Sequence, residues 1–268
     1  NPIQERDQWV DKNLEVNLFE DDAPLYEFVV YKLNEDLYGY FIKCHHIIAD
    51  GWSMQLLTNK IACIYENLKY EKLVPVSYEA YCDYIEKEQM YLGSGKYWQD
   101  KEYWKMQFSP IPPDENFPID SQISVRGNRM QFFLENELSI ELKNFCAHYG
   151  LSIGNCLLGI LYVLIAKVTG EEDIVIGTPV LGRTGRKERE TFGMFVNSLP
   201  IRYVVERNQT LLSTLKNISR QMRKAYLSQK YPYNHLLRDL GVMKYGYSGL
   251  YKVCFNYYNT ELCQNLDG

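Results

Sequence analysis

Two adjacent histidines are the residues best suited to chemistry in this chain. His45 and His46 are two of only four histidines, and they open the run His45-His46-Ile47-Ile48-Ala49-Asp50-Gly51-Trp52-Ser53. A neutral imidazole accepts protons well near neutral pH. Asp50 follows His46 by four residues across a predicted turn, where its carboxylate would orient a histidine or hold the turn through an ion pair. Gly51 lets backbone or substrate approach closely.

The segment before the histidines predicts the strand that would carry them. Residues 38–46 are rich in aromatic and β-branched side chains. Successive strand side chains point to opposite faces, so only one histidine of the pair can easily face a cleft. For an arbitrary His-His pair, two structural histidines at a strand end are the commoner arrangement. Ser53 is then expected to open a helix, because apolar residues recur every three or four positions from Met54 to Leu68.

Helices and strands are mixed in both halves of the chain, which predicts an α/β or α+β fold. Apolar periodicity with Ser, Thr and Gly at the ends predicts helices over 77–91, 96–108, 139–150, 152–170 and 234–240, and a long one from Thr210. Strands are predicted over 127–138, 173–180, 198–206 and 250–258. Prolines cluster just after residue 109, and proline suits neither helix nor central strand. We therefore expect one lobe over 1–112, a linker over 113–126 and a second lobe over 127–268.

Composition excludes several classes of protein. Lysine and arginine number 29 against 34 acidic residues, a net charge of −5, which argues against a nucleic-acid binder. The longest apolar run covers 156–166, far short of the roughly 20 residues of a membrane span. The seven cysteines include no C-x-x-C pair, so we expect mostly buried, reduced thiols in a cytoplasmic protein, with no metal site and no directly bound cofactor. The first residue, Asn1, and the strand-like end suggest a piece of a longer protein.

The histidine run resembles the HHxxxDG motif of condensation domains of non-ribosomal peptide synthetases. These belong to the HxxxD acyltransferases, which have a chloramphenicol-acetyltransferase-like fold. Further stretches resemble later motifs of the family in the expected order: Tyr81-Cys82-Asp83-Tyr84, residues 176–183, residues 192–202 with Ser198 where Thr is usual, Gln229-Lys230-Tyr231-Pro232-Tyr233, and residues 250–256. The resemblance spans nearly the whole chain, although the first two family motifs and the end of the second lobe are not visible.

The resemblance implies a fold of two similar lobes with mixed sheets, flanking helices and a substrate tunnel, truncated here. It implies amide formation between an acyl or peptidyl thioester on one carrier protein and an aminoacyl amine on another. His46, Asp50 and Gly51 become the catalytic-motif residues, with His46 acting as base or positioning group and opening toward the gap between the lobes. The supporting residues would be His45, Trp52, Ser53, Arg183 and Asn197.

The resemblance also sets expectations for partners and leaves alternatives open. Arg183 is the candidate partner of Asp50, and an arginine from a missing upstream segment is its rival. Substrates would arrive on the 4′-phosphopantetheine of upstream and downstream peptidyl carrier domains, beside an adenylation domain, with neither nucleic acid nor membrane involved. The chain alone is expected to be inactive and to self-associate. An epimerisation domain, a CoA-dependent HxxxD acyltransferase and a non-catalytic docking platform of the same fold remain the alternatives.

Overall fold

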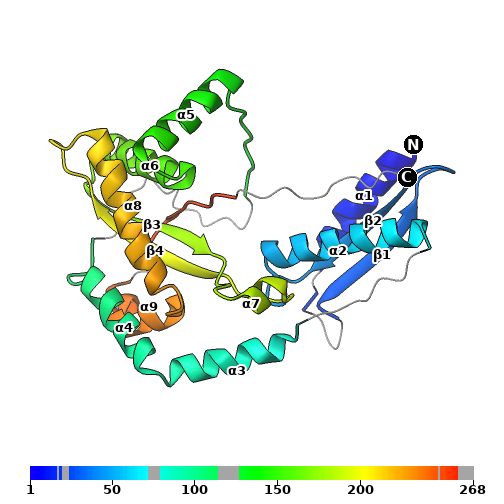
Figure 1. The fold of residues 1–268 in the computed structure, drawn as a ribbon, viewed down its shortest axis with the longest axis horizontal. Helices are drawn as coiled ribbons and strands as arrows, with labels where there is room; N and C mark the ends of the chain where they lie inside the picture. The colour runs from blue at the N-terminus through cyan, green and yellow to red at the C-terminus, as the bar shows by residue number, and fades with distance from the viewer. Residues whose placement is uncertain (17, 20–23, 72–78, 114–126, 247, 259–268) are drawn as a thin grey trace. The chain divides into compact units, whose positions relative to one another are not determined.

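The structure, a computed structural model, describes residues 1–16, 18–19, 24–71, 79–113, 127–246 and 248–258. These residues divide into two compact units (Figure 1). The first unit holds Asn1–Glu86 and Arg183–Phe195, and the second holds Lys87–Gly182 and the described residues from Val196 onward. Both units contain helices and strands, as expected. Nearly all of the expected linker over 113–126 lies outside the described residues, so the limits of the predicted lobes stay a prediction.

An antiparallel hairpin and a helix that lies along it form one part of the first unit (Figure 1). Strand β1 pairs with β2 from Tyr26↔Cys44 to Lys32↔Tyr38. Trp9 of α1 packs edge-to-face on Phe41 of β2. Lys43 donates hydrogen bonds of 2.5 Å to the backbone oxygens of Asn13, in the last turn of α1, and Val16, just after it. The first unit contains these elements: α1 (Pro2–Leu14), β1 (Tyr26–Lys32), β2 (Tyr38–Cys44), α2 (Gly51–Lys69), the start of α3 (Tyr81–Leu92) and α7 (Arg186–Glu190).

The strand before the histidines is shorter than predicted. Strand β2 ends at Cys44, and both histidines lie in the turn that follows it. Strand alternation therefore does not decide which way they face. Helix α2 begins at Gly51, and Asp50 rather than Ser53 is its N-cap. An aspartate suits this position because its carboxylate accepts an otherwise unpaired N–H of the first turn.

The second unit is built on a three-stranded sheet with the order β4-β3-β5. Strands β3 and β4 are antiparallel, and β5 runs parallel to β3. Helices α6 and α8 pack against each other along this sheet (Figure 1). They meet closely at Gly159, where a Cβ would lie 2.4 Å from the side chain of Leu215. The elements are α4 (Gly95–Gln107), α5 (Asn136–Tyr149), α6 (Ile153–Thr169), β3 (Asp173–Val180), β4 (Asn197–Val204), α8 (Leu211–Leu227), α9 (Tyr233–Leu240), a 3₁₀ helix (Val242–Tyr245) and β5 (Val253–Cys254).

The ends of α6 and α8 follow the sequence signals closely. Ser152 caps α6 and Gly170 ends it in the left-handed conformation, while Thr210 caps α8. Apolar side chains of both helices enter the core of the unit, among them Tyr162 and Ile218, each fully buried. Capping and periodicity therefore predicted these elements correctly.

Two predicted strands are wrong or much too long. Residues 127–135 have no regular secondary structure, and α5 begins at Asn136, so Ser139 lies inside the helix instead of capping it. The large apolar side chains of the supposed strand, such as Phe132 and Phe133, are exposed. The strand predicted over 250–258 is reduced to Val253–Cys254. A strand needs a neighbour for its backbone hydrogen bonds, and alternation alone does not supply one.

Two remaining features are the length of the apolar helices and the state of the cysteines. Within the described residues, no single helix has both the length and the apolar character to cross a membrane; α5 and α6 meet that test only jointly, with a bend of 101° between them. The six described cysteines are free thiols, but only Cys146 and Cys156 are buried, so the expectation of mostly buried cysteines is wrong. Cys263 lies outside the described residues.

Candidate active site

The two histidines occupy different environments in the turn after β2. The Nδ1 atom of His45 accepts a hydrogen bond of 3.1 Å from the backbone N–H of Ile47. The ring of His45 also packs edge-on against Phe19, with 4.8 Å between ring centroids. His46 is exposed. The turn therefore fixes His45 and presents His46 to solvent.

Asp50 closes the turn and is completely buried. Its Oδ1 atom accepts the N–H of Ser53 at 2.8 Å. Its Oδ2 atom accepts from Arg183 Nη1 at 2.5 Å and from the N–H of Phe195 at 3.0 Å. Burial alone would raise the pKa of Asp50, but the bonds from Arg183, Ser53 and Phe195 outweigh burial and lower that pKa below its usual value. Asp50 is therefore ionised at neutral pH and cannot serve as a proton donor there.

Arg183 is the arginine that pairs with Asp50, as expected, and its side chain is also fully buried. Its Nη2 atom donates to Ser53 Oγ at 2.8 Å and to the carbonyl of Gly193 at 3.1 Å. Its guanidinium lies 4.0 Å from the ring centroid of Phe195, a cation–π contact. A buried charge is tolerated only when it is paired and hydrogen-bonded, and this one is.

Ser53 joins the histidine segment to residues 191–195. Its hydroxyl donates to the carbonyl of Gly193 at 2.7 Å and accepts the N–H of the same residue at 2.9 Å, in addition to the bond from Arg183. A serine hydroxyl can donate one hydrogen bond and accept two, so the hydroxyl of Ser53 uses its full capacity here. Trp52 adds a bond of 2.9 Å from its indole N–H to the carbonyl of Arg189 in α7. Helix α7 thus lies beside the first turn of α2 (Figure 1).

The remaining predicted residues lie in two places. Gly51 is the exposed first residue of α2. Asn197 belongs to the second unit, where its Nδ2 atom donates to the carbonyls of Gln229 and Tyr231 at 2.8 Å each. Its carboxamide ties the start of β4 to the connection between α8 and α9. The supporting role of Asn197 stays a prediction.

Sequence reasoning missed the part played by Tyr81, Gly193 and Phe195. Tyr81 donates from its hydroxyl to the carbonyl of Met194 at 2.5 Å. All three residues lie in stretches that resemble family motifs. The resemblance therefore marked these residues but did not show which contacts they make. The N-cap role of Asp50 was missed because Ser53 is an equally good cap by residue type.

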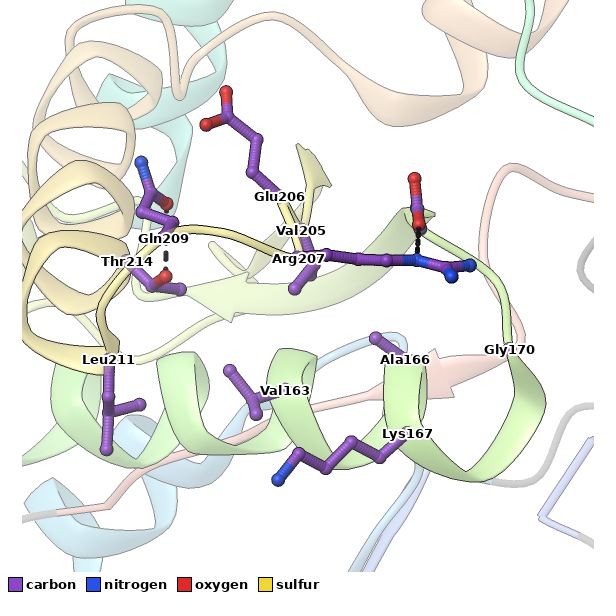
Figure 2. Close-up of a pocket in the computed structure, with 11 residues that line it drawn as sticks. Val163, Ala166, Lys167, Gly170, Val205, Glu206, Arg207, Gln209, Leu211 and Thr214 are labelled. Atoms are coloured by element: carbon purple, nitrogen blue, oxygen red, sulfur yellow. Dashed lines mark hydrogen bonds and ion pairs between the residues drawn. The ribbon is translucent and has the colours of Figure 1, made fainter.

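A separate pocket of about 460 Å³ lies in the second unit (Figure 2). It is bordered by the end of α6 and the connection from β4 to α8. Arg207 and Glu172 pair with each other at its rim, and the Gln209 carboxamide oxygen accepts a hydrogen bond from Thr214. None of the residues predicted to do chemistry lines this pocket.

Comparison with known proteins identifies the family. The condensation-domain family matches residues 2–266, so the chain belongs to that family. The chain is 30% identical over 242 residues to a plipastatin synthase protein of Bacillus subtilis (strain 168), covering 88% of this chain and 9% of that protein. It is 32% identical over 222 residues to bacitracin synthase 3 of Bacillus licheniformis, covering 81% of this chain and 3% of that protein. The chain thus spans less than a tenth of these relatives.

Solved structures confirm the fold. The first condensation domain of the CDA synthetase matches all of this chain with a TM-score of 0.81 at 24% identity, and the chain covers 59% of it. VibH, an NRPS condensation enzyme, matches 90% of the chain with a TM-score of 0.78 at 22% identity, and the chain covers 57% of it. The expected chloramphenicol-acetyltransferase-like fold is therefore present, and the chain corresponds to about three fifths of such a domain.

Proposed function

We propose that the protein containing this chain forms an amide bond between a carrier-bound acyl or peptidyl thioester and a carrier-bound aminoacyl amine. The observation that carries the proposal is that the two histidines in the turn after β2 have different surroundings. His46 is exposed, while His45 and the Asp50–Arg183 pair are engaged in holding the turn. Sequence similarity to plipastatin and bacitracin synthases supports the same reaction.

The chemistry needs one positioned group on the amine. The amine nitrogen attacks the thioester carbonyl, a C–N bond forms, the C–S bond breaks, and the thiol of the donor carrier leaves. His46 either accepts the proton that the amine loses or holds the amine by a hydrogen bond while it attacks. A positioned base contributes about 10²- to 10⁴-fold to such a step, so orientation of the two substrates supplies the rest of the rate.

The partners follow from the substrates. Both acyl groups would arrive on the 4′-phosphopantetheine arms of peptidyl carrier domains, one upstream and one downstream, and a neighbouring adenylation domain would load the acceptor. The relatives are far longer than this chain, which suits a domain that works between other domains. The reaction runs on tethered substrates, so this chain needs no cofactor of its own for it.

The test is His46→Ala in the full-length parent, assayed for amide product with both carriers loaded. We expect the rate to fall by about 10²-fold or more with an unchanged melting temperature. His148→Ala, which removes a histidine at the end of α5 in the second unit, is the matched control and should keep the wild-type rate. A folded His46→Ala protein that condenses at the wild-type rate would falsify the proposal.

The variant His46→Gln separates the two roles of His46. A glutamine side chain can hold the amine by a hydrogen bond but does not accept its proton near neutral pH. Rescue of His46→Gln to a large fraction of the wild-type rate would indicate that hydrogen bonding to the amine is sufficient, and a loss as large as that of His46→Ala would indicate proton transfer.

A further inference from the structure

Residues 193–195 lie between two groups of side chains in the first unit. On one side, Ser53 and Asp50 bind the N–H groups of Gly193 and Phe195. On the other side stands the first turn of α3, which contributes Tyr81 and Tyr84. Tyr81 and Tyr84 take no part in the mechanism proposed above, yet they also contact residues 193–195 directly.

Tyr81 fits the backbone of this segment closely. Its hydroxyl donates to the carbonyl of Met194 at 2.5 Å. Its ring lies so close to Gly193 that a Cβ there would come within 2.2 Å of a ring carbon. The φ of Gly193 is +156°, a value that residues with side chains rarely adopt. The ring and the glycine therefore fix each other's position.

The contact extends from Tyr81 to the buried ion pair through Phe195. The rings of Tyr81 and Phe195 meet edge-to-face at 5.3 Å, and those of Tyr84 and Phe195 lie 4.2 Å apart. Phe195 also contacts the guanidinium of Arg183, at 4.0 Å from the ring centroid. A shift of Tyr81 would move both the backbone that Asp50 binds and the ring on which Arg183 rests.

The histidine turn is attached to the same network. Ala49 and Asp50, the last residues before α2, are buried, and His46 lies four residues before Asp50. The position of the exposed His46 therefore depends on how Asp50 is held. Asp50 in turn is held by Arg183 and by the N–H of Phe195.

We propose that Tyr81 is a positioning residue for the condensation reaction: its hydroxyl and ring hold residues 193–195 against the Asp50–Ser53–Arg183 network and so fix the turn that carries His46. The inference rests on the proposed function. Tyr81 itself touches no reacting atom; it acts through Met194 and Gly193. Small displacements of a reacting group cost large factors in rate, so a bond this far from the chemistry can matter.

The test is Tyr81→Phe in the full-length parent with both carriers loaded. This variant keeps the ring against Gly193 and removes only the bond to Met194. We expect kcat to fall about tenfold, with KM for the loaded carriers unchanged, because substrate binding is intact and orientation is not. Tyr162→Phe is the matched control: it removes a tyrosine bond of the same length, 2.5 Å, to the backbone carbonyl of Ile201 in the second unit. The control should keep kcat.

A second comparison asks whether Tyr81 and Ser53 act on the same segment. In a double-mutant cycle of Tyr81→Phe with Ser53→Ala, kcat should fall by less than the product of the two single effects, because either change alone releases residues 193–195. Three results would each overturn the positioning role. The two single effects on kcat multiply in the double mutant, or Tyr81→Phe keeps the wild-type kcat. In the third, Tyr162→Phe loses as much kcat and as much melting temperature as Tyr81→Phe does. A wild-type parent that makes no amide would overturn the proposed function and this inference together.

Discussion

Removing the charge of Asp50 tests whether this residue is structural. In Asp50→Asn the side chain keeps its size, but the guanidinium of Arg183, fully buried, loses the carboxylate that neutralises it. Breaking a buried ion pair in this way costs about 3–5 kcal/mol of the free energy of unfolding. With about 2–4 °C per kcal/mol for a domain of comparable size, the melting temperature should fall by roughly 6–20 °C.

The pair Arg186–Glu190 provides the matched control. It joins an arginine to a carboxylate at 3.1 Å, but its side chains are 91% and 55% exposed. An exposed pair contributes about 0–1 kcal/mol, so Glu190→Gln should melt within about 4 °C of the wild type. Both variants are compared by thermal unfolding in the same buffer, together with their rates of amide formation in the full-length parent.

The pH dependence of the effect has a definite sign. The folded pKa of Asp50 is lowered, so its contribution to stability is complete above the unfolded carboxyl pKa of about 3.9 and is lost as the pH falls through the lower folded value. The difference in stability between wild type and Asp50→Asn should therefore be constant near neutral pH and shrink below about pH 4. If Asp50→Asn melts like the wild type while only its rate falls, Asp50 acts in the reaction and the structural reasoning is wrong.

Three further outcomes are expected. Gly177→Ala should destabilise the second unit by about 1–3 kcal/mol in urea unfolding, because a Cβ would lie 2.2 Å from the ring of Tyr251; an unchanged midpoint would contradict that packing. Iodoacetamide should label exposed Cys63 well before buried Cys156, since burial and the neighbouring Cys146 raise the pKa of Cys156 to about 11; equal rates in the folded chain would refute this. The chain alone should self-associate, because Phe28 and Val30 of β1 are exposed; a monomer at all concentrations in sedimentation would count against it.

Local signals in the sequence predicted the elements that need no distant partner. Helix α6 has its serine cap, its apolar stripe and its terminal glycine within one short stretch, and the structure follows all three. Strand β3 has the predicted limits because its apolar run is buried in the core. The supposed strand over 127–138 carried the same kind of pattern, yet the structure gives it no hydrogen-bonded neighbour among the described residues.

The candidate site was only partly predictable for the same reason. The types and spacing of His46 and Asp50 indicated chemistry, but no local pattern shows that Arg183 lies beside Asp50. That pairing was expected from resemblance to a family, and the structure contains it. The contacts of Tyr81 with Met194 join residues that are 113 positions apart, and spacing along the chain carries no information about such a pair.

The buried network around Asp50 also has consequences for how the protein folds. Asp50 is bound by Phe195, 145 residues later in the chain. Closing a flexible loop of that length costs about 4 kcal/mol of entropy before any contact compensates for it. At a synthesis rate of about 5–20 residues per second, Phe195 leaves the ribosome roughly 7–30 s after Asp50. For most of that interval neither Arg183 nor Phe195 has been made, so the histidine turn reaches its final form only after most of the described chain has been made.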